Sequence, residues 1–113
     1  MAYESVFETF EAIGQDGRAR KVVFKRAGFL AAGDQPELYF FEVNAESMVV
    51  GVSGDALQSW QREHRYLSRE EKIDVAGLCL KQRIEQAEAP VDKNLRIARS
   101  ELEFLLELLG IRG

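Results

Sequence analysis

Reactive side chains are scarce in this sequence. Its 113 residues include a single cysteine, Cys79, and a single histidine, His64. One cysteine cannot form an internal disulfide, which is typical of proteins in a reducing compartment. Cys79 and His64 together do not make a metal site, which needs three or four ligands at a recognisable spacing. We therefore expect no disulfide, no metal and no cofactor.

Signals for membranes and secretion are missing as well. No apolar run approaches the roughly 20 residues that span a bilayer. Glu4 stands where a signal peptide would carry positive charge, and no apolar region follows it. The formal net charge of −4 disfavours nonspecific binding to nucleic acids and to anionic membranes. We expect a cytoplasmic protein without membrane contacts, and nucleic acid is an unfavoured partner.

The composition is that of a folded domain. Hydrophobic residues make up 46% of the chain and charged residues 30%, as in ordinary globular proteins. A chain of this length buries roughly two-thirds of the surface that its unfolded form exposes. We predict a single domain over residues 1–113, in which residues 90–113 form a C-terminal extension.

The firmest local signal is a strand, turn, strand and helix between Leu38 and Trp60. β-Branched and aromatic residues predict strands at Leu38–Val43 and Met48–Val52, joined by a turn at Asn44–Ser47. Side chains of the first strand are apolar on both faces, since Tyr39, Phe41 and Val43 alternate with Leu38, Phe40 and Glu42. This strand is expected to lie in a sheet covered on both faces, or to have its second face covered by a partner chain.

The N-terminal part is less clear. Residues 6–13 are compatible with a helix or a strand, and we favour a strand because the turn signal Gly14–Gly17 and the alternating segment Arg18–Arg26 follow it. Gly28 is expected to break the second strand, and residues 31–36 read as a loop.

Two helices are expected after the central strands. Ser53 caps the first, on which Leu57, Trp60 and His64 share one face, so His64 should be half-buried. Ser68 and Glu71 form a capping box that opens a second helix through about Gln86. The following residues are expected on its inward stripe or beside it, with Gly77 allowing close approach: Ile73, Ala76, Gly77, Leu80 and Ile84.

The C-terminal extension carries the most apolar helix. A short strand is expected at Leu95–Ala98, then a second capping box at Ser100–Glu103 and a helix that ends at Gly110. This helix is apolar nearly all round, so burial in its own domain and self-association are both open. We expect a homodimer, or docking of another protein, with these interface residues: Phe104, Leu105, Leu108 and Leu109.

The junction at Gly51–Asp55 lies where a hydrolase would place its nucleophile, between a strand and a helix. That motif needs glycine where Asp55 stands, and His64 lies about 16 Å from Ser53 along the helix. We therefore expect no catalytic residue. A site for a small ligand or anion remains a candidate here, with Ser53, Gly54, Asp55 and His64 as its residues.

The basic residues cluster between Arg18 and Arg26. Strand alternation puts Arg18 and Arg20 on one face and Lys21 and Lys25 on the other, so their charge is split. Protection of an edge strand against aggregation explains this cluster better than contact with nucleic acid.

The segment Met48–Leu57 has a strand that runs into a Ser-x-x-Ala-Leu helix start, and a second helix with Ile73, Ala76 and Lys81 follows. In this it resembles a group of small bacterial domains of unknown function. The resemblance implies a bacterial cytoplasmic protein of α+β type and supplies no catalytic residues. The chain departs from that pattern from Pro90 onward.

Together these features predict an α+β fold, in which an N-terminal antiparallel sheet of about four strands packs against two helices and a C-terminal leucine-rich helix. The favoured function is a noncatalytic module that binds a protein partner or a small ligand. One alternative is a small enzyme with its site at Ser53 and Asp55. The other is a nucleic-acid-associated regulator that uses Arg18–Arg26.

Overall fold

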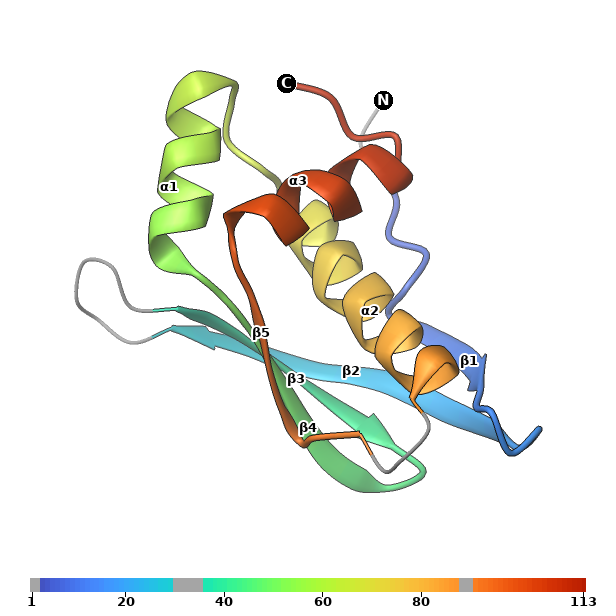
Figure 1. The fold of residues 1–113 in the computed structure, drawn as a ribbon. Coiled ribbons are helices and arrows are strands. Elements are labelled where there is room, and N and C mark those ends of the chain that lie inside the picture. The colour runs from blue at the N-terminus through green and yellow to red at the C-terminus, as the bar shows by residue number, and fades with distance from the viewer. Residues whose placement is uncertain (1–2, 30–35, 88–90) are drawn as a thin grey trace.

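A computed structural model describes residues 3–29, 36–87 and 91–113 of the chain. It has the predicted α+β fold, with a mixed sheet on one side and helices on the other (Figure 1). The elements follow in the order β1 (Thr9–Ile13), β2 (Ala19–Phe29), β3 (Glu37–Val43), β4 (Glu46–Val52), α1 (Gly54–Glu63), α2 (Arg69–Gln86), β5 (Asn94–Ile97) and α3 (Arg99–Leu108).

The sheet has five strands in the order β1-β2-β3-β4-β5, where about four were expected. The first four strands form an antiparallel meander, and the short strand β5 adds to β4 in parallel. Two residues with positive φ, Asn44 at 50° and Ala45 at 70°, connect β3 to β4. This is the tight two-residue connection whose twist matches the strands that it joins.

The three helices all lie on one face of the sheet (Figure 1). Alternate residues of β3 (Tyr39, Phe41 and Val43) are buried on this face, as the sequence predicts. They pack into one core with the inward stripe of α2, which is the predicted one. Leu102, Leu105 and Leu106 of α3 complete the same core. The C-terminal segment therefore shares its core with the rest of the chain.

The opposite face of the sheet has no covering helix among the described residues. Leu38, Phe40 and Glu42 of β3 are half-buried there. The prediction of a sheet covered on both faces by this chain is therefore wrong. A partner chain on this face stays a prediction.

Residues 3–7 are fastened to α2 by the buried carboxylate of Asp74. This carboxylate accepts hydrogen bonds from the hydroxyls of Tyr3 and Ser5 at 2.5 Å each, and from the backbone N–H groups of Val6 and Phe7 at 3.0 Å. One helical turn further along α2, a Cβ added to Gly77 would lie 2.6 Å from the Phe7 Cβ. The close approach expected at Gly77 is confirmed, and it is the N-terminal segment that approaches.

Several predicted boundaries change. Residues 6–13 contain a strand, as favoured, but it begins at Thr9. Gly28 does not break β2, which continues to Phe29. The loop predicted at 31–36 lies, apart from Pro36, outside the described residues.

The start of α3 was also predicted incorrectly. The helix begins at Arg99 with Ala98 as its N-cap, so Ser100 lies inside the first turn and caps nothing. Glu103 pairs instead with Arg99 at 2.9 Å, and this contact takes the carboxylate that a capping box would need. The predicted end at Gly110 is confirmed by its φ of 74° and by the bond from the Ile111 N–H to the Leu106 carbonyl. Among the described residues, no helix combines the length and hydropathy needed to cross a membrane.

Candidate functional site

Ser53 acts as the cap of α1 at the point where β4 ends. Its Oγ accepts a hydrogen bond from the Ala56 backbone N–H at 3.3 Å, and its own N–H donates to the Ile97 carbonyl at 3.0 Å. Next to it, Gly54 is buried and Asp55 is exposed. The predicted cap is thus confirmed, and its hydroxyl already satisfies one of the free N–H groups of the first helical turn.

His64 lies at the opposite end of α1, as its C-cap. Its ring is exposed and stacks on the indole of Trp60, with ring centroids 4.5 Å apart and an angle of 14° between the planes. The expectation of a half-buried imidazole is therefore wrong, because α1 ends one residue before His64 and the ring lies on the rim of the core. Ser53 and His64 are separated by the whole helix, so the structure does not bring the four predicted ligand-binding residues together.

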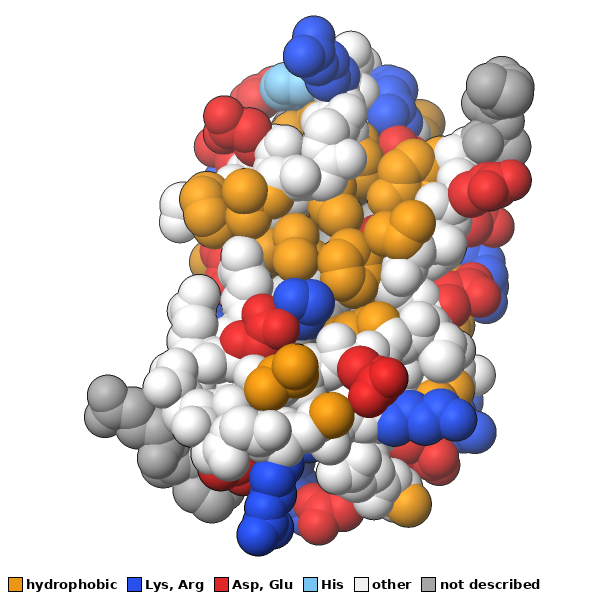
Figure 2. All heavy atoms as spheres, turned by 90° about the vertical axis from the view of Figure 1, so that its right-hand side faces the viewer, with side chains coloured by type: hydrophobic (Ala, Val, Ile, Leu, Met, Phe, Trp, Pro, Cys, Tyr) orange, Lys and Arg blue, Asp and Glu red, His pale blue; other side chains and the backbone are white. Residues whose placement is uncertain are grey.

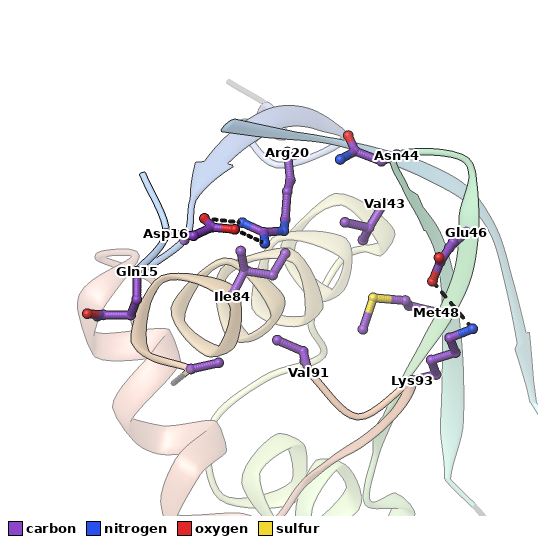
Figure 3. Close-up of a pocket in the computed structure, with 12 residues that line it drawn as sticks. Gln15, Asp16, Arg20, Val43, Asn44, Glu46, Met48, Ile84, Val91 and Lys93 are labelled. Atoms are coloured by element: carbon purple, nitrogen blue, oxygen red, sulfur yellow. Dashed lines mark hydrogen bonds and ion pairs between the residues drawn. The ribbon is translucent and has the colours of Figure 1, made fainter. Parts of the chain in front are cut away.

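A cavity of about 430 Å³ opens at the end of the sheet, between the two hairpin turns and the last turn of α2 (Figure 3). Arg20 binds both carboxylate oxygens of Asp16, at 2.9 and 3.2 Å, and this contact lowers the pKa of Asp16. Across the mouth, Lys93 pairs with Glu46 at 3.3 Å. The rim charges are thus already paired, and the floor is apolar, formed by Val43, Met48, Ile84 and Val91.

A second cavity of about 310 Å³ lies beside the stacked Trp60 and His64 rings and the end of α3. Glu103 and Glu107 also line it. Neither of these two cavities is lined by Ser53 or Asp55. In the described part of the chain, no group of three or more histidine, cysteine, aspartate or glutamate side chains is placed to hold a metal ion.

The Cys79 thiol and the phenols of Tyr3 and Tyr39 are held in their neutral forms. Burial and, to a smaller extent, the nearby Glu101 carboxylate raise the pKa of the Cys79 thiol to about 12. Burial also raises the pKa of Tyr39, whose hydroxyl donates to Glu37 at 2.8 Å. The pKa of Tyr3 is raised by burial and by its bond to Asp74. A protonated thiol and two protonated phenols are poor nucleophiles and poor bases. Cys79 is fully buried in the core.

In comparisons with known proteins, the chain matches no family model, and no curated protein or solved structure is significantly similar to it. The resemblance to small bacterial domains therefore stays a prediction. Functional inference depends on the surfaces of this chain alone.

The C-terminal helix divides the predicted interface residues into two groups. Leu105 is fully buried in the core of its own chain, so it is not available to a partner. Leu109 is half-buried against that core. Phe104 and Leu108 are each 53% exposed. Helix α3 therefore contributes to the core along one side and presents apolar side chains to solvent along another.

Phe104 and Leu108 belong to a larger exposed apolar area. Glu101 identifies the side of α3 that faces α2. It accepts a hydrogen bond from the Cys79 thiol and pairs with Arg83 at 3.2 Å, and both of these residues belong to α2. On the other side of α2 lies the N-terminal segment, in contact with Gly77. Figure 2 shows apolar side chains gathered on this face of the molecule. We name this area the α2–α3 surface and define it by Val6, Phe7, Leu78, Phe104 and Leu108.

Three residues of the α2–α3 surface were missed by the sequence analysis. Leu78 lies outside the inward stripe of α2, so its position on the helical wheel was the signal that could have revealed it. Val6 and Phe7 could not be placed from the sequence. Their position depends on the buried Asp74, which fastens their backbone to α2.

Proposed function

We propose that this protein is a noncatalytic interaction module that self-associates through the α2–α3 surface. The observation that carries the proposal is the exposure of Phe104 and Leu108, two large apolar side chains one helical turn apart. Val6, which is 63% exposed, belongs to the N-terminal segment that is fastened to α2. Exposed apolar side chains that gather in one place are characteristic of protein interfaces, whereas single ones are common everywhere.

The charges around the surface support a second copy of this chain as the partner. Arg83 pairs with Glu101, and Lys81 pairs with Glu85 at 2.8 Å. Each pair presents one positive and one negative group at the edge of the apolar area. In a two-fold dimer a surface meets itself, so a border that carries both signs can form ion pairs with its own copy. A border of one sign would instead repel the second copy.

The proposal is tested by sedimentation velocity over protein concentrations from about 1 to about 200 µM, a range that includes the weak association of small interfaces. The wild type should shift from monomer to dimer within this range. Phe104→Asp and Leu108→Asp should remain monomeric, since each places a carboxylate in the contact. Tyr66→Asp is the matched control, because Tyr66 is an aromatic residue with 84% exposure in the connection between α1 and α2.

Two results would contradict the proposal. One is a wild type that remains monomeric over the whole range. The other is a dimer that Phe104→Asp and Leu108→Asp weaken no more than Tyr66→Asp does. Circular dichroism of each variant checks that the fold is kept. Leu105→Asp is not a useful probe, because Leu105 is fully buried and a carboxylate at this position would disrupt the core.

A further inference from the structure

A bulge in β2 gathers basic side chains on the uncovered face of the sheet, which we call the outer face. The register of β2 against β3 shifts between Phe24 and Arg26, so Lys25 is an extra residue. Strict alternation would place Arg26 on the side of Phe24, toward the helices. The shift instead pairs Arg26 with Phe40, whose side chain points to the outer face. Lys25 reaches Glu42 on the same face, at 3.7 Å. The predicted split of charge did not assign Arg26 to a face, and the bulge places it on the same face as Lys25.

Arg26 and Phe40 form a flat stacked pair on this face. The guanidinium carbon of Arg26 lies 4.0 Å from the centroid of the Phe40 ring. Arg26 and Phe40 begin a row of paired residues that crosses the sheet from β2 to β5. Val49 on β4 lies opposite Phe40, and Asn94 on β5 lies opposite Val49. Aromatic and guanidinium planes are the groups on which unstacked bases bind in single-stranded nucleic acids.

The neighbouring row ends in a second arginine that lies against the sheet. It consists of Gly28, Leu38, Gly51 and Arg96. A Cβ added to Gly51 would lie 3.1 Å from Nη1 of Arg96 and 3.4 Å from Cδ2 of Leu38. The missing side chain of Gly51 thus leaves the space in which the Arg96 side chain lies over the strand.

The two rows form an open platform with positive ends. Strand spacing separates Arg26 on β2 from Arg96 on β5 by about 14 Å. The eight residues of the rows include two arginines and no carboxylate. No helix of the described chain covers this face (Figure 1). A flat apolar strip between two cationic ends is complementary to a short run of bases flanked by phosphates.

We infer that the outer face binds single-stranded nucleic acid. Bases stack on Phe40 and on the planes of the arginines, and phosphates contact Arg26, Lys25 and Arg96. A duplex keeps its bases stacked on one another, so it cannot use this platform. The formal net charge of −4 does not oppose such binding, because the two rows contain no carboxylate and Glu42, which borders them on this face, is paired with Lys25 at 3.7 Å. This inference is independent of self-association through the α2–α3 surface.

The test is fluorescence anisotropy with labelled single strands of about 12 nucleotides, in DNA and RNA form, at about 20 mM salt and upwards. Phe40→Leu keeps an apolar side chain without the ring and should weaken binding by about fivefold or more. Arg26→Gln and Arg96→Gln should each lower the salt slope of log K by about 0.7, the value for one lost phosphate contact to a single strand. The matched control is Arg62→Gln, which removes an exposed arginine from α1 on the helical side.

Four results would overturn the inference. They are absence of salt-sensitive binding by the wild type, equal or tighter binding of a duplex of the same sequence, equal weakening by Arg62→Gln, and full affinity in Phe40→Leu. A fifth such result is aggregation of Arg26→Gln with unchanged affinity. It would assign Lys25 and Arg26 to protection of the part of β2 beyond Val23, with which β1 no longer pairs. Thermal unfolding of each variant shows whether lost binding reflects a lost fold.

Discussion

Replacement of Asp74 by asparagine should release the N-terminal segment from α2. Asp74 is 0% exposed. Its carboxylate accepts from four donors, the hydroxyls of Tyr3 and Ser5 and the N–H groups of Val6 and Phe7. These partners are all neutral, and all are donors. Asparagine has nearly the same shape, yet it replaces one acceptor oxygen by an NH₂ group that meets donors.

The size of the effect follows from the number of donors that lose their acceptor. A buried donor without a partner costs about 1–3 kcal/mol, and a bond to a charged acceptor is stronger than a neutral one. With two donors affected, Asp74→Asn should cost about 3–5 kcal/mol if the segment stays docked. Tyr3→Phe and Ser5→Ala each remove one donor and leave the carboxylate with the others, so each should cost about 1 kcal/mol.

Release of the segment limits the cost, because an undocked segment lets water reach the side chain. Two measurements are therefore needed. Urea unfolding gives the change in the free energy of global unfolding. Amide hydrogen exchange at Val6 and Phe7 gives the free energy of local opening, which should fall toward zero in Asp74→Asn.

The reasoning would be refuted by an Asp74→Asn variant that unfolds within 1 kcal/mol of the wild type and keeps the protection of both amides. It would also be refuted if Tyr3→Phe destabilised the chain more than Asp74→Asn. In that case the Tyr3 hydroxyl, and not the full set of four donors on the carboxylate, would hold the segment.

Two further predictions concern the buried ionisable side chains. Arg65 binds both carboxylate oxygens of Glu71, at 2.8 and 3.0 Å, and thereby holds the pKa of Glu71 below its usual value. A carboxylate whose pKa is lowered in the folded state stabilises the fold at pH values above its unfolded pKa. It loses this contribution as the pH falls through its folded pKa. Urea unfolding should therefore show a decline in stability below about pH 4.3 that is shallower in Glu71→Gln, and equal declines would contradict the role of the Arg65 contact. Cys79, whose pKa is about 12, should resist Ellman's reagent in the folded protein at neutral pH and react on addition of urea; reaction of the folded protein at the rate of the unfolded chain would contradict its burial.

The sequence predicted elements that depend on neighbours along the chain. The turn at Gly14–Gly17 and the cap at Ser53 are set by residues within a few positions of one another, and both were correctly placed. The turn predicted at Asn44–Ser47 is shorter in the structure, because β4 already begins at Glu46. The capping box at Ser68 was identified for the same reason as the cap at Ser53. The same residue spacing at Ser100 and Glu103 also predicted a capping box, but none forms there. There, Arg99 competes for Glu103 and also binds Glu63 of α1 at 2.8 Å, a contact across the fold that no local pattern reveals.

Features that depend on distant parts of the chain were out of reach. The periodicity of α3 marks an apolar helix but not its rotation, so Leu105 and Phe104 could not be assigned to core and solvent. The bulge at Lys25 decides on which face Arg26 lies, and nothing between Arg18 and Arg26 signals it. For Asp74, the only signal in the sequence was an acidic residue inside a predicted helix. Its partners lie near the N-terminus, far away in sequence.

The parallel pairing of β5 with β4 has a consequence for synthesis of the chain. All other strand pairs join neighbours in the sequence, whereas β5 follows two helices. Until the ribosome has made Asn94–Ile97, the backbone groups of β4 on that side have no partner strand. Before β5 is made, Val50 and Val52 belong to an open β edge that can template aggregation. In the folded chain they pair with Leu95 and Ile97 of β5. A nascent chain halted before Asn94 would therefore aggregate more readily than a chain in which β5 has paired with β4.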